Sequence, residues 1–265
     1  MNKASRSLPF ERGLFQRLAP FLAVFVQIGA TFLPNLGLGE PIQARSDAVR
    51  TLITPAGWAF AIWGPLFLGS AAFAVYQALP SQARSALLDR ITWPAAGVFT
   101  ANGVWAAYTQ FNNLDIGSAI IIAIGLGCAL AAMRIFSRLD RRLTRTERWL
   151  TVLPLSALAA WLSAATIVNI SAMLTYYGVG GDYSQPLVTA VIVIVGGAIA
   201  AFAIMQERGN PVYALVFLWA LLAIYFAGGQ REPAVAYAAI ASGVLVILAT
   251  IARLRIPKNR RIWFG

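Results

Sequence analysis

Two asparagines lie inside long apolar runs, each on the same helical face as a tryptophan. In "FTANGVW" Asn102 precedes Trp105 by three residues, and in "WLSAATIVN" Trp161, Ala165 and Asn169 follow at intervals of four. Such spacings place each amide and its indole on one side of a helix. Aromatic walls with a few amides to orient a ligand are typical of a pocket for a flat, mostly apolar molecule. The alternative is that each amide only bonds a neighbouring helix.

A third aromatic cluster occupies residues 54–67, "TPAGWAFAIWGPLF". Phe60, Trp63 and Phe67 fall on one stripe of a helix, whereas Trp58 points about 140° away from Trp63. We expect Trp63 to face the helix bundle and Trp58 to lie near the outer membrane interface. The opposite assignment stays open at this point.

The same stretch carries signals for the start of a helix. Thr54 is expected to cap the helix, and Pro55 suits its first turn. Pro65 lies about two turns further on, where it lacks an N–H and should leave the carbonyl of Ala61 without its helical partner. That carbonyl then needs another donor.

The chain lacks the residues of most catalytic and metal sites. It has no histidine and one cysteine, Cys128, so zinc sites of the tetrahedral kind and histidine-ligated haem are excluded. The apolar runs contain no confidently buried Asp, Glu, Lys or Arg, which counts against an ion-driven pump and against an ordinary enzyme. We assign no catalytic residue and no metal ligand, and we expect no required cofactor.

Composition places the chain in a lipid bilayer. Of its 265 residues 59% are hydrophobic and 12% charged, with a mean hydropathy of +0.69. Apolar runs close to the ~20 residues that span hydrocarbon recur along its length. They predict an all-α polytopic membrane protein with about eight transmembrane helices, at residues 18–36, 56–79, 93–110, 116–135, 149–175, 187–205, 211–227 and 233–252.

The distribution of basic residues predicts an orientation. Of the 21 Lys and Arg residues, 18 lie at the two ends of the chain or in alternate connections, and the other three are Arg45, Arg50 and Arg231. The positive-inside bias then places both termini in the cytoplasm, in what we expect to be a bacterial inner membrane. The net charge of +11 reflects this topology and anionic lipid rather than nucleic acid. Residues 134–148, with six arginines, could also hold a cytoplasmic partner or an anionic lipid headgroup.

These motifs together resemble the TspO/MBR family, the tryptophan-rich sensory proteins that include the mitochondrial translocator protein. "PAGWAFAIWGPLF" is similar to the family's second helix, "FTANGVW" to its third and "WLSAATIVN" to its fifth, in the same order. The resemblance covers about residues 15–176. The chain departs from the family in residues 37–54, which lack an aromatic segment, and in having three further helices, whose notable aromatics are Trp219 and Tyr225.

The resemblance implies a five-helix bundle that binds a porphyrin, another tetrapyrrole or a sterol-like ligand. Carried over residue by residue, it implies ligand-binding roles for Trp58, Phe60, Trp63, Asn102, Trp105, Trp161, Ala165 and Asn169. Some compact relatives are linked to light-dependent porphyrin breakdown, which the resemblance would carry to Trp63 and Trp161.

The predicted organisation is a basic cytoplasmic N-terminus (1–17), a TspO-like five-helix bundle (18–176), three additional helices (177–252) and a basic tail (253–265). The favoured function is a membrane receptor, sensor or carrier for a small hydrophobic ligand. One alternative is a passive or exchange transporter of a small organic solute, although no inverted repeat supports it. Another is an assembly partner that docks a second copy or another membrane protein through small residues such as Gly196, Gly197 and Ala200.

Overall fold

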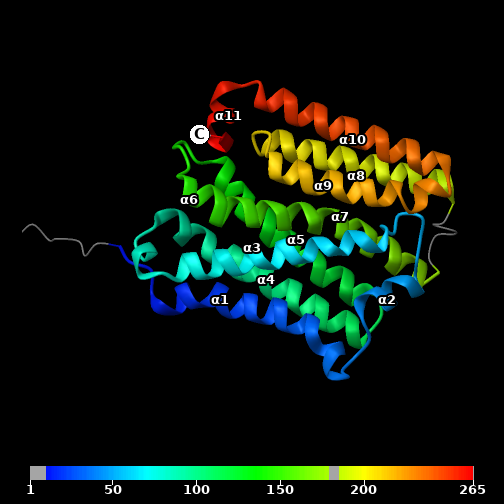
Figure 1. Ribbon diagram of the computed structural model, residues 1–265, viewed down its shortest axis with the longest axis horizontal. Coiled ribbons are helices and arrows are strands. Elements are labelled where there is room, and N and C mark those ends of the chain that lie inside the picture. Colours follow the sequence, from blue (N-terminus) through cyan, green and yellow to red (C-terminus); the bar gives the residue numbers. More distant parts are fainter. Residues whose placement is uncertain (1–9, 179–184, 265) are drawn as a thin grey trace, which may run out of the picture.

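The computed structural model describes residues 10–178 and 185–264, and these residues form helices without any strand (Figure 1). Lys3 and Arg6 of the predicted N-terminal basic segment lie outside the described residues. The first half contains α1 (Leu14–Gly29), η1 (Ala30–Leu36), α2 (Ile42–Ala48), η2 (Gly57–Ile62), α3 (Trp63–Ala78), η3 (Pro80–Gln82), α4 (Ala86–Phe111) and α5 (Ile116–Ser137). The second half contains α6 (Arg145–Glu147), η4 (Arg148–Val152), α7 (Leu153–Tyr176), α8 (Pro186–Gln206), α9 (Pro211–Tyr225), η5 (Gly228–Gln230), α10 (Pro233–Leu254) and α11 (Pro257–Phe264).

Seven segments of the described chain are long and apolar enough to cross a membrane. The seven segments are α1–η1, η2–α3, α5, α6–α7, α8, α9–η5 and α10. The 26-residue α4 is the eighth long helix. Because α4 packs between α1 and α5, it can carry buried polar residues such as Asn102 and Gln110 that a lipid-facing helix could not. Both described ends of the chain lie at the same end of the bundle (Figure 1), as an even number of antiparallel helices requires.

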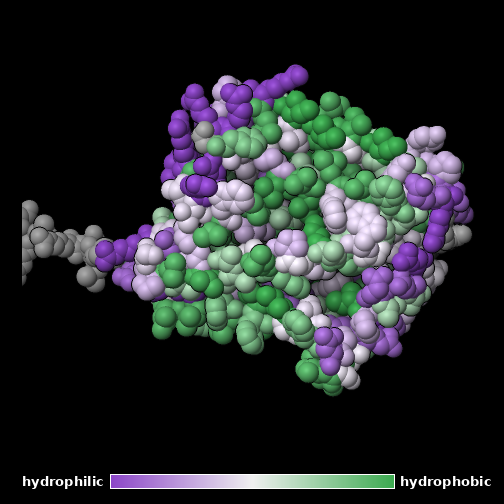
Figure 2. Space-filling view, viewed as in Figure 1, coloured by the Kyte–Doolittle hydropathy of each residue, from purple (hydrophilic) through white to green (hydrophobic). Residues whose placement is uncertain are grey.

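The surface is apolar where a soluble protein would be polar. Large side chains such as Phe25 (76% exposed), Leu187 (75%) and Leu68 (73%) point outward. Figure 2 shows hydrophobic residues over the middle of the bundle and hydrophilic residues gathered at its ends. A patch of this extent would be unfavourable in water, so the chain is an integral membrane protein. The side that faces the cytoplasm stays a prediction from the charge pattern.

Helix α7 is the most buried of the seven segments and contacts α3, α5, α8 and α9. Two side-chain hydrogen bonds join it to α9 and the turn before it. Asn210 Nδ2 donates to Ser156 Oγ at 2.8 Å, and the hydroxyl of Tyr213 lies 2.8 Å from Ser163 Oγ. Since buried polar groups in an apolar surrounding need partners, these bonds define how α9 sits against α7.

The small residues of α8 pack within the molecule. Gly196, Gly197 and Ala200 are buried, and a Cβ on Gly197 would overlap Ser242 of α10. Ser242 Oγ in turn donates to the carbonyl of Val193 at 3.0 Å. This face is therefore used by α10 and is not free to dock a partner.

The start of the second membrane segment differs from the prediction. Thr54 Oγ1 accepts from the N–H of Thr51 at 3.0 Å in the preceding turn, so Thr54 does not cap the helix. Residues 57–62 form a 3₁₀ turn and the α-helix begins at Trp63, so Pro65 lies in the first turn of α3 and does not kink it. The first turn of an α-helix tolerates proline, because the N–H groups of that turn have no intrahelical acceptor.

The structure suggests that Gly103 is needed for the contact between α1 and α4. A Cβ at this position would lie 2.8 Å from backbone atoms of Val26 and Gln27, which cannot rotate away. We expect Gly103→Ala to destabilise the protein by about 1–3 kcal/mol, the usual cost of overpacking, measured as a lower thermal unfolding midpoint in detergent.

Gly127→Ala in α5 is the matched control, because a Cβ there meets nothing within 4 Å. Equal midpoints for Gly103→Ala and Gly127→Ala would contradict the proposed close approach.

Glu207 follows α8 and is 9% exposed. Burial raises its pKa from 4.5 to about 7, while a hydrogen bond with Ser137 and the charges of Arg134, Arg208 and Arg138 act in the opposite direction. Between these two pKa values the folded protein holds more protons than the unfolded chain. Stability therefore decreases as the pH rises from about 4.5 to about 7.

We expect Glu207→Gln to remove this pH dependence. The neutral amide cannot ionise, so at pH values above 7 the variant should avoid a cost of up to about 3 kcal/mol. Thermal unfolding midpoints of both proteins between pH 5 and 8 provide the measurement. If the wild-type midpoint rises over this pH range relative to that of Glu207→Gln, the raised pKa of Glu207 is contradicted.

Candidate functional site

Two adjoining cavities lie between α4, α7 and the start of α3. The first has a volume of about 290 Å³ and the second about 60 Å³. They share Ile42, Phe60 and Trp105 as a common wall. The remaining lining of the first is Thr31, Pro34, Asn35, Pro41, Gln43, Trp63, Phe67, Asn102, Ala106 and Gln110, and that of the second is Ser46, Pro55, Leu114, Trp161, Ala164, Ala165, Val168, Asn169, Ala220 and Ile224.

Seven of the eight residues expected to bind a ligand line these cavities. They are Phe60, Trp63, Asn102, Trp105, Trp161, Ala165 and Asn169. Trp63 faces the bundle as expected, and the three motifs from helices distant in sequence converge on one place. The eighth residue, Trp58, lines neither cavity. Whether the seven bind a ligand stays a prediction.

The aromatic side chains form a continuous wall. The rings of Trp63 and Trp161 meet edge to face at 6.0 Å, and Phe60 meets Trp161 edge to face at 6.3 Å. Phe67 stacks on Trp63 at 5.2 Å with an interplanar angle of 27°. Each of these geometries is favourable for aromatic pairs, and the joined rings offer faces and edges to a flat molecule.

Several polar groups around the cavities lack partners within the described chain. The indole nitrogens of Trp105 and Trp161 are buried without an acceptor, and no hydrogen bond involves the side-chain amide of Asn102. Gln110 Nε2 donates to the carbonyls of Ala30 and Ala106, while its Oε1 is buried without a donor. Unpaired buried polar atoms are unfavourable, so these groups favour a ligand that supplies hydrogen-bonding atoms.

Asn169 has a structural role as well. Its Nδ2 donates to Ser118 Oγ of α5 at 3.1 Å, and its Oδ1 lies 3.2 Å from the same hydroxyl. The amide therefore joins α7 to α5, which is the packing alternative that the sequence left open. Of the two asparagines, Asn102 is the one whose side-chain amide makes no hydrogen bond within the described residues.

A cover over the cavities comes from residues 30–48, which the sequence analysis did not assign to the site. Thr31, Pro34 and Asn35 of η1 line the first cavity, and Ile42 of α2 lines both. Pro41 directly precedes α2, a helix-start signal that could have revealed this short helix. Its contribution to the cavity depends on how the loop folds back, which no local pattern encodes.

The C-terminal helices also reach the site. Ala220 and Ile224 of α9 line the second cavity. Trp58 packs against this same region, with its ring edge to face on Trp219 at 4.9 Å and on Phe226 at 6.4 Å. Trp219 Nε1 donates to the carbonyl of Ala59 at 3.2 Å, in the 3₁₀ turn. The prediction of an unpaired carbonyl at Ala61 is wrong, because that carbonyl accepts a backbone N–H at the end of the 3₁₀ turn.

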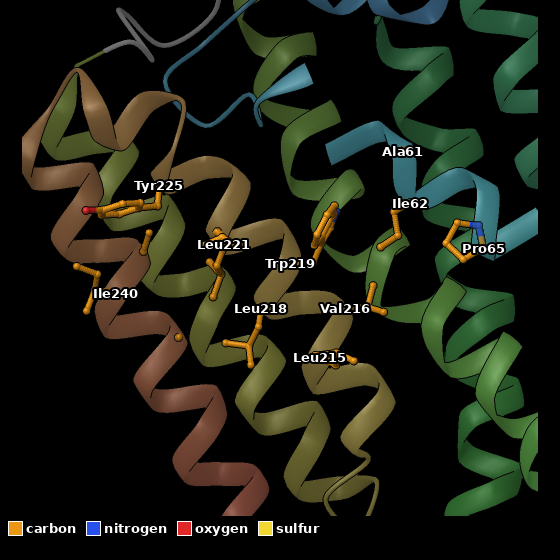
Figure 3. Close-up of a pocket in the computed structure, with 13 residues that line it drawn as sticks. Ala61, Ile62, Pro65, Leu215, Val216, Leu218, Trp219, Leu221, Tyr225 and Ile240 are labelled. Carbon is orange, nitrogen blue, oxygen red and sulfur yellow. The ribbon is translucent and has the colours of Figure 1, made fainter. Parts of the chain in front are cut away.

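A hollow larger than either cavity lies elsewhere. It is a groove of about 740 Å³ bordered by η2 and the start of α3 on one side and by α9 and α10 on the other (Figure 3). Its lining is apolar, and Leu215 and Ile240 at its rim are 70% and 52% exposed. An apolar groove of this kind on a membrane-spanning surface can accommodate lipid chains.

The family model of TSPO-like proteins matches residues 15–252, from α1 to the end of α10. Neither a curated protein nor a solved structure matches the chain. The sequence resemblance ended near residue 176, whereas this match includes the three C-terminal helices. Because it covers most of the chain, including all three cavity-lining motifs and α9, the protein belongs to the family of TSPO-like proteins.

Proposed function

We propose that this protein is a membrane receptor or sensor that binds a flat, largely apolar ligand in the two adjoining cavities. The ligand carries hydrogen-bond acceptors, and a porphyrin or related tetrapyrrole has these properties. The observation that carries the proposal is that Trp105 and Trp161, which line the cavities, each have a buried indole N–H without a partner in the described chain.

Shape and polarity support a ligand of this class. The edge-to-face array of Phe60, Trp63 and Trp161 presents rings against which a flat molecule can pack. Two indole N–H donors and the free amide of Asn102 can bond carbonyl or carboxylate oxygens or ring nitrogens. The aromatic walls supply affinity, and the polar groups supply orientation.

The size of the cavities sets a condition on binding. About 290 and 60 Å³ are at or below the ~300 Å³ lower end of typical small-molecule sites. A molecule as large as a porphyrin therefore requires the cover formed by η1 and α2 to move outward. Opening this cover breaks its hydrogen bonds to α4. Gln110 Nε2 donates to the carbonyl of Ala30 at 2.8 Å, and the carbonyl of Gln110 accepts from the N–H of Glu40 at 2.8 Å and from Arg45 Nη2 at 3.4 Å.

The proposal predicts that losing one indole N–H weakens binding even when an aromatic ring is kept at that position. Trp161→Phe and Trp105→Phe should each raise the dissociation constant for protoporphyrin about five- to tenfold, the equivalent of one net hydrogen bond of ~1–1.4 kcal/mol. Binding is measured from the porphyrin absorbance of detergent-solubilised protein, because the variants change tryptophan fluorescence itself.

Trp58→Phe is the matched control, since Trp58 lines neither cavity, and it should bind as the wild type does. Asn102→Leu tests the free amide without breaking the bond between α7 and α5. The proposal fails if Trp161→Phe and Trp105→Phe bind protoporphyrin with unchanged affinity, or if Trp58→Phe weakens binding as much as they do.

A further inference from the structure

A further cavity is lined in part by α11, which Figure 1 shows at the end of the bundle where the described chain ends. Its volume is about 270 Å³, and it lies between the loop after α5, the turn between α8 and α9, and α11. Five of its nine lining residues are basic, namely Arg141, Arg142, Arg208, Lys258 and Arg261, and Asp140 is the one acid. Figure 2 shows hydrophilic residues gathered at this end.

Part of this positive charge is already used by the protein. Arg141 makes a bidentate contact to Glu147, with distances of 2.8 and 2.6 Å. Arg208 Nη1 donates to the carbonyl of Leu139 at 3.0 Å. These bonds hold the loop and the turn in place and orient the cavity walls.

Asp140, the acidic residue of the cavity, does not neutralise the remaining positive charge of the lining arginines and lysine. Asp140 lies 3.6 Å from Lys258 and 3.9 Å from Arg208, and its side chain is 87% exposed. Ion pairs of this kind are weak. Arg142 and Arg261 make no side-chain hydrogen bond or ion pair within the described residues, so the cavity holds two unpaired guanidinium groups.

The chemistry of these groups identifies a class of ligand. A guanidinium binds phosphate oxygens through two parallel N–H donors, and several cations around one concave site favour an anion with several oxygens. We propose that this cavity binds a phosphate group, carried by an anionic phospholipid or present as the free ion, with Arg142 and Arg261 as its principal contacts.

The position of the cavity suits a lipid headgroup. Trp149 and Phe264, at the same end of the bundle, are 60% and 62% exposed, as aromatic residues at a membrane interface commonly are. The cavity therefore lies near the depth of the lipid phosphates. A phosphate held there would join the loop after α5 to α11, two segments that are separate in sequence.

The test uses the full-length protein in a neutral detergent at low salt. Native mass spectrometry measures the binding of phosphatidylglycerol, with phosphatidylcholine of the same chain length for comparison, and thermal unfolding measures stabilisation by inorganic phosphate. Arg142→Gln and Arg261→Gln are compared with Arg260→Gln, which removes a charge from the same helix at a position that does not line the cavity.

We expect phosphatidylglycerol to bind more tightly than phosphatidylcholine, and Arg142→Gln and Arg261→Gln each to weaken it about fivefold, while Arg260→Gln leaves it unchanged. If the cavity binds the free phosphate ion, inorganic phosphate raises the unfolding midpoint of the wild type. This stabilisation should be weaker in Arg142→Gln and Arg261→Gln and unchanged in Arg260→Gln. The proposal is overturned if Arg260→Gln weakens binding as much as Arg261→Gln, or if phosphatidylglycerol binds no better than phosphatidylcholine and phosphate has no effect.

Discussion

The arrangement of the helices depends on the polar side chains of α7 that must find partners inside an apolar surrounding. Asn169 bonds Ser118 of α5 on one side, while Ser156 and Ser163 bond Asn210 and Tyr213 on the other. In hydrocarbon, apolar burial does little to distinguish one helix pairing from another, so hydrogen bonds and close packing carry that role. These bonds position α5 and α9 against α7.

The aromatic site follows from this arrangement. Once α7 is held between α5 and α9, Trp161 lies against Phe60 and Trp63, and Ala220 and Ile224 of α9 close the second cavity. Of the three C-terminal helices, α9 is therefore part of the candidate site. The family match across residues 15–252 agrees with this integration, while the domain boundary drawn at residue 176 stays a prediction.

Much of the site could be predicted because its residues lie on regular helices. The intervals between Asn102 and Trp105 and between Trp161 and Asn169 translate directly into shared faces. Intervals along the sequence do not predict a shared face where the helix is not a regular α-helix. The 3₁₀ turn at residues 57–62 moves the start of α3 to Trp63, so the expected cap at Thr54 and the expected kink at Pro65 are both absent.

The sequence by itself determined the membrane environment, the eight long helices, the family and the faces that carry the tryptophans and asparagines, because hydropathy and helical periodicity are local properties. Only the tertiary structure decided that Asn169 is paired while Asn102 is not, that Trp58 packs on Trp219, and that residues 30–48 cover the cavities. It also brought Arg142 and Arg261 to one basic cavity. These outcomes depend on contacts between segments far apart in the chain, and the spacing of residues within one helix does not predict such contacts.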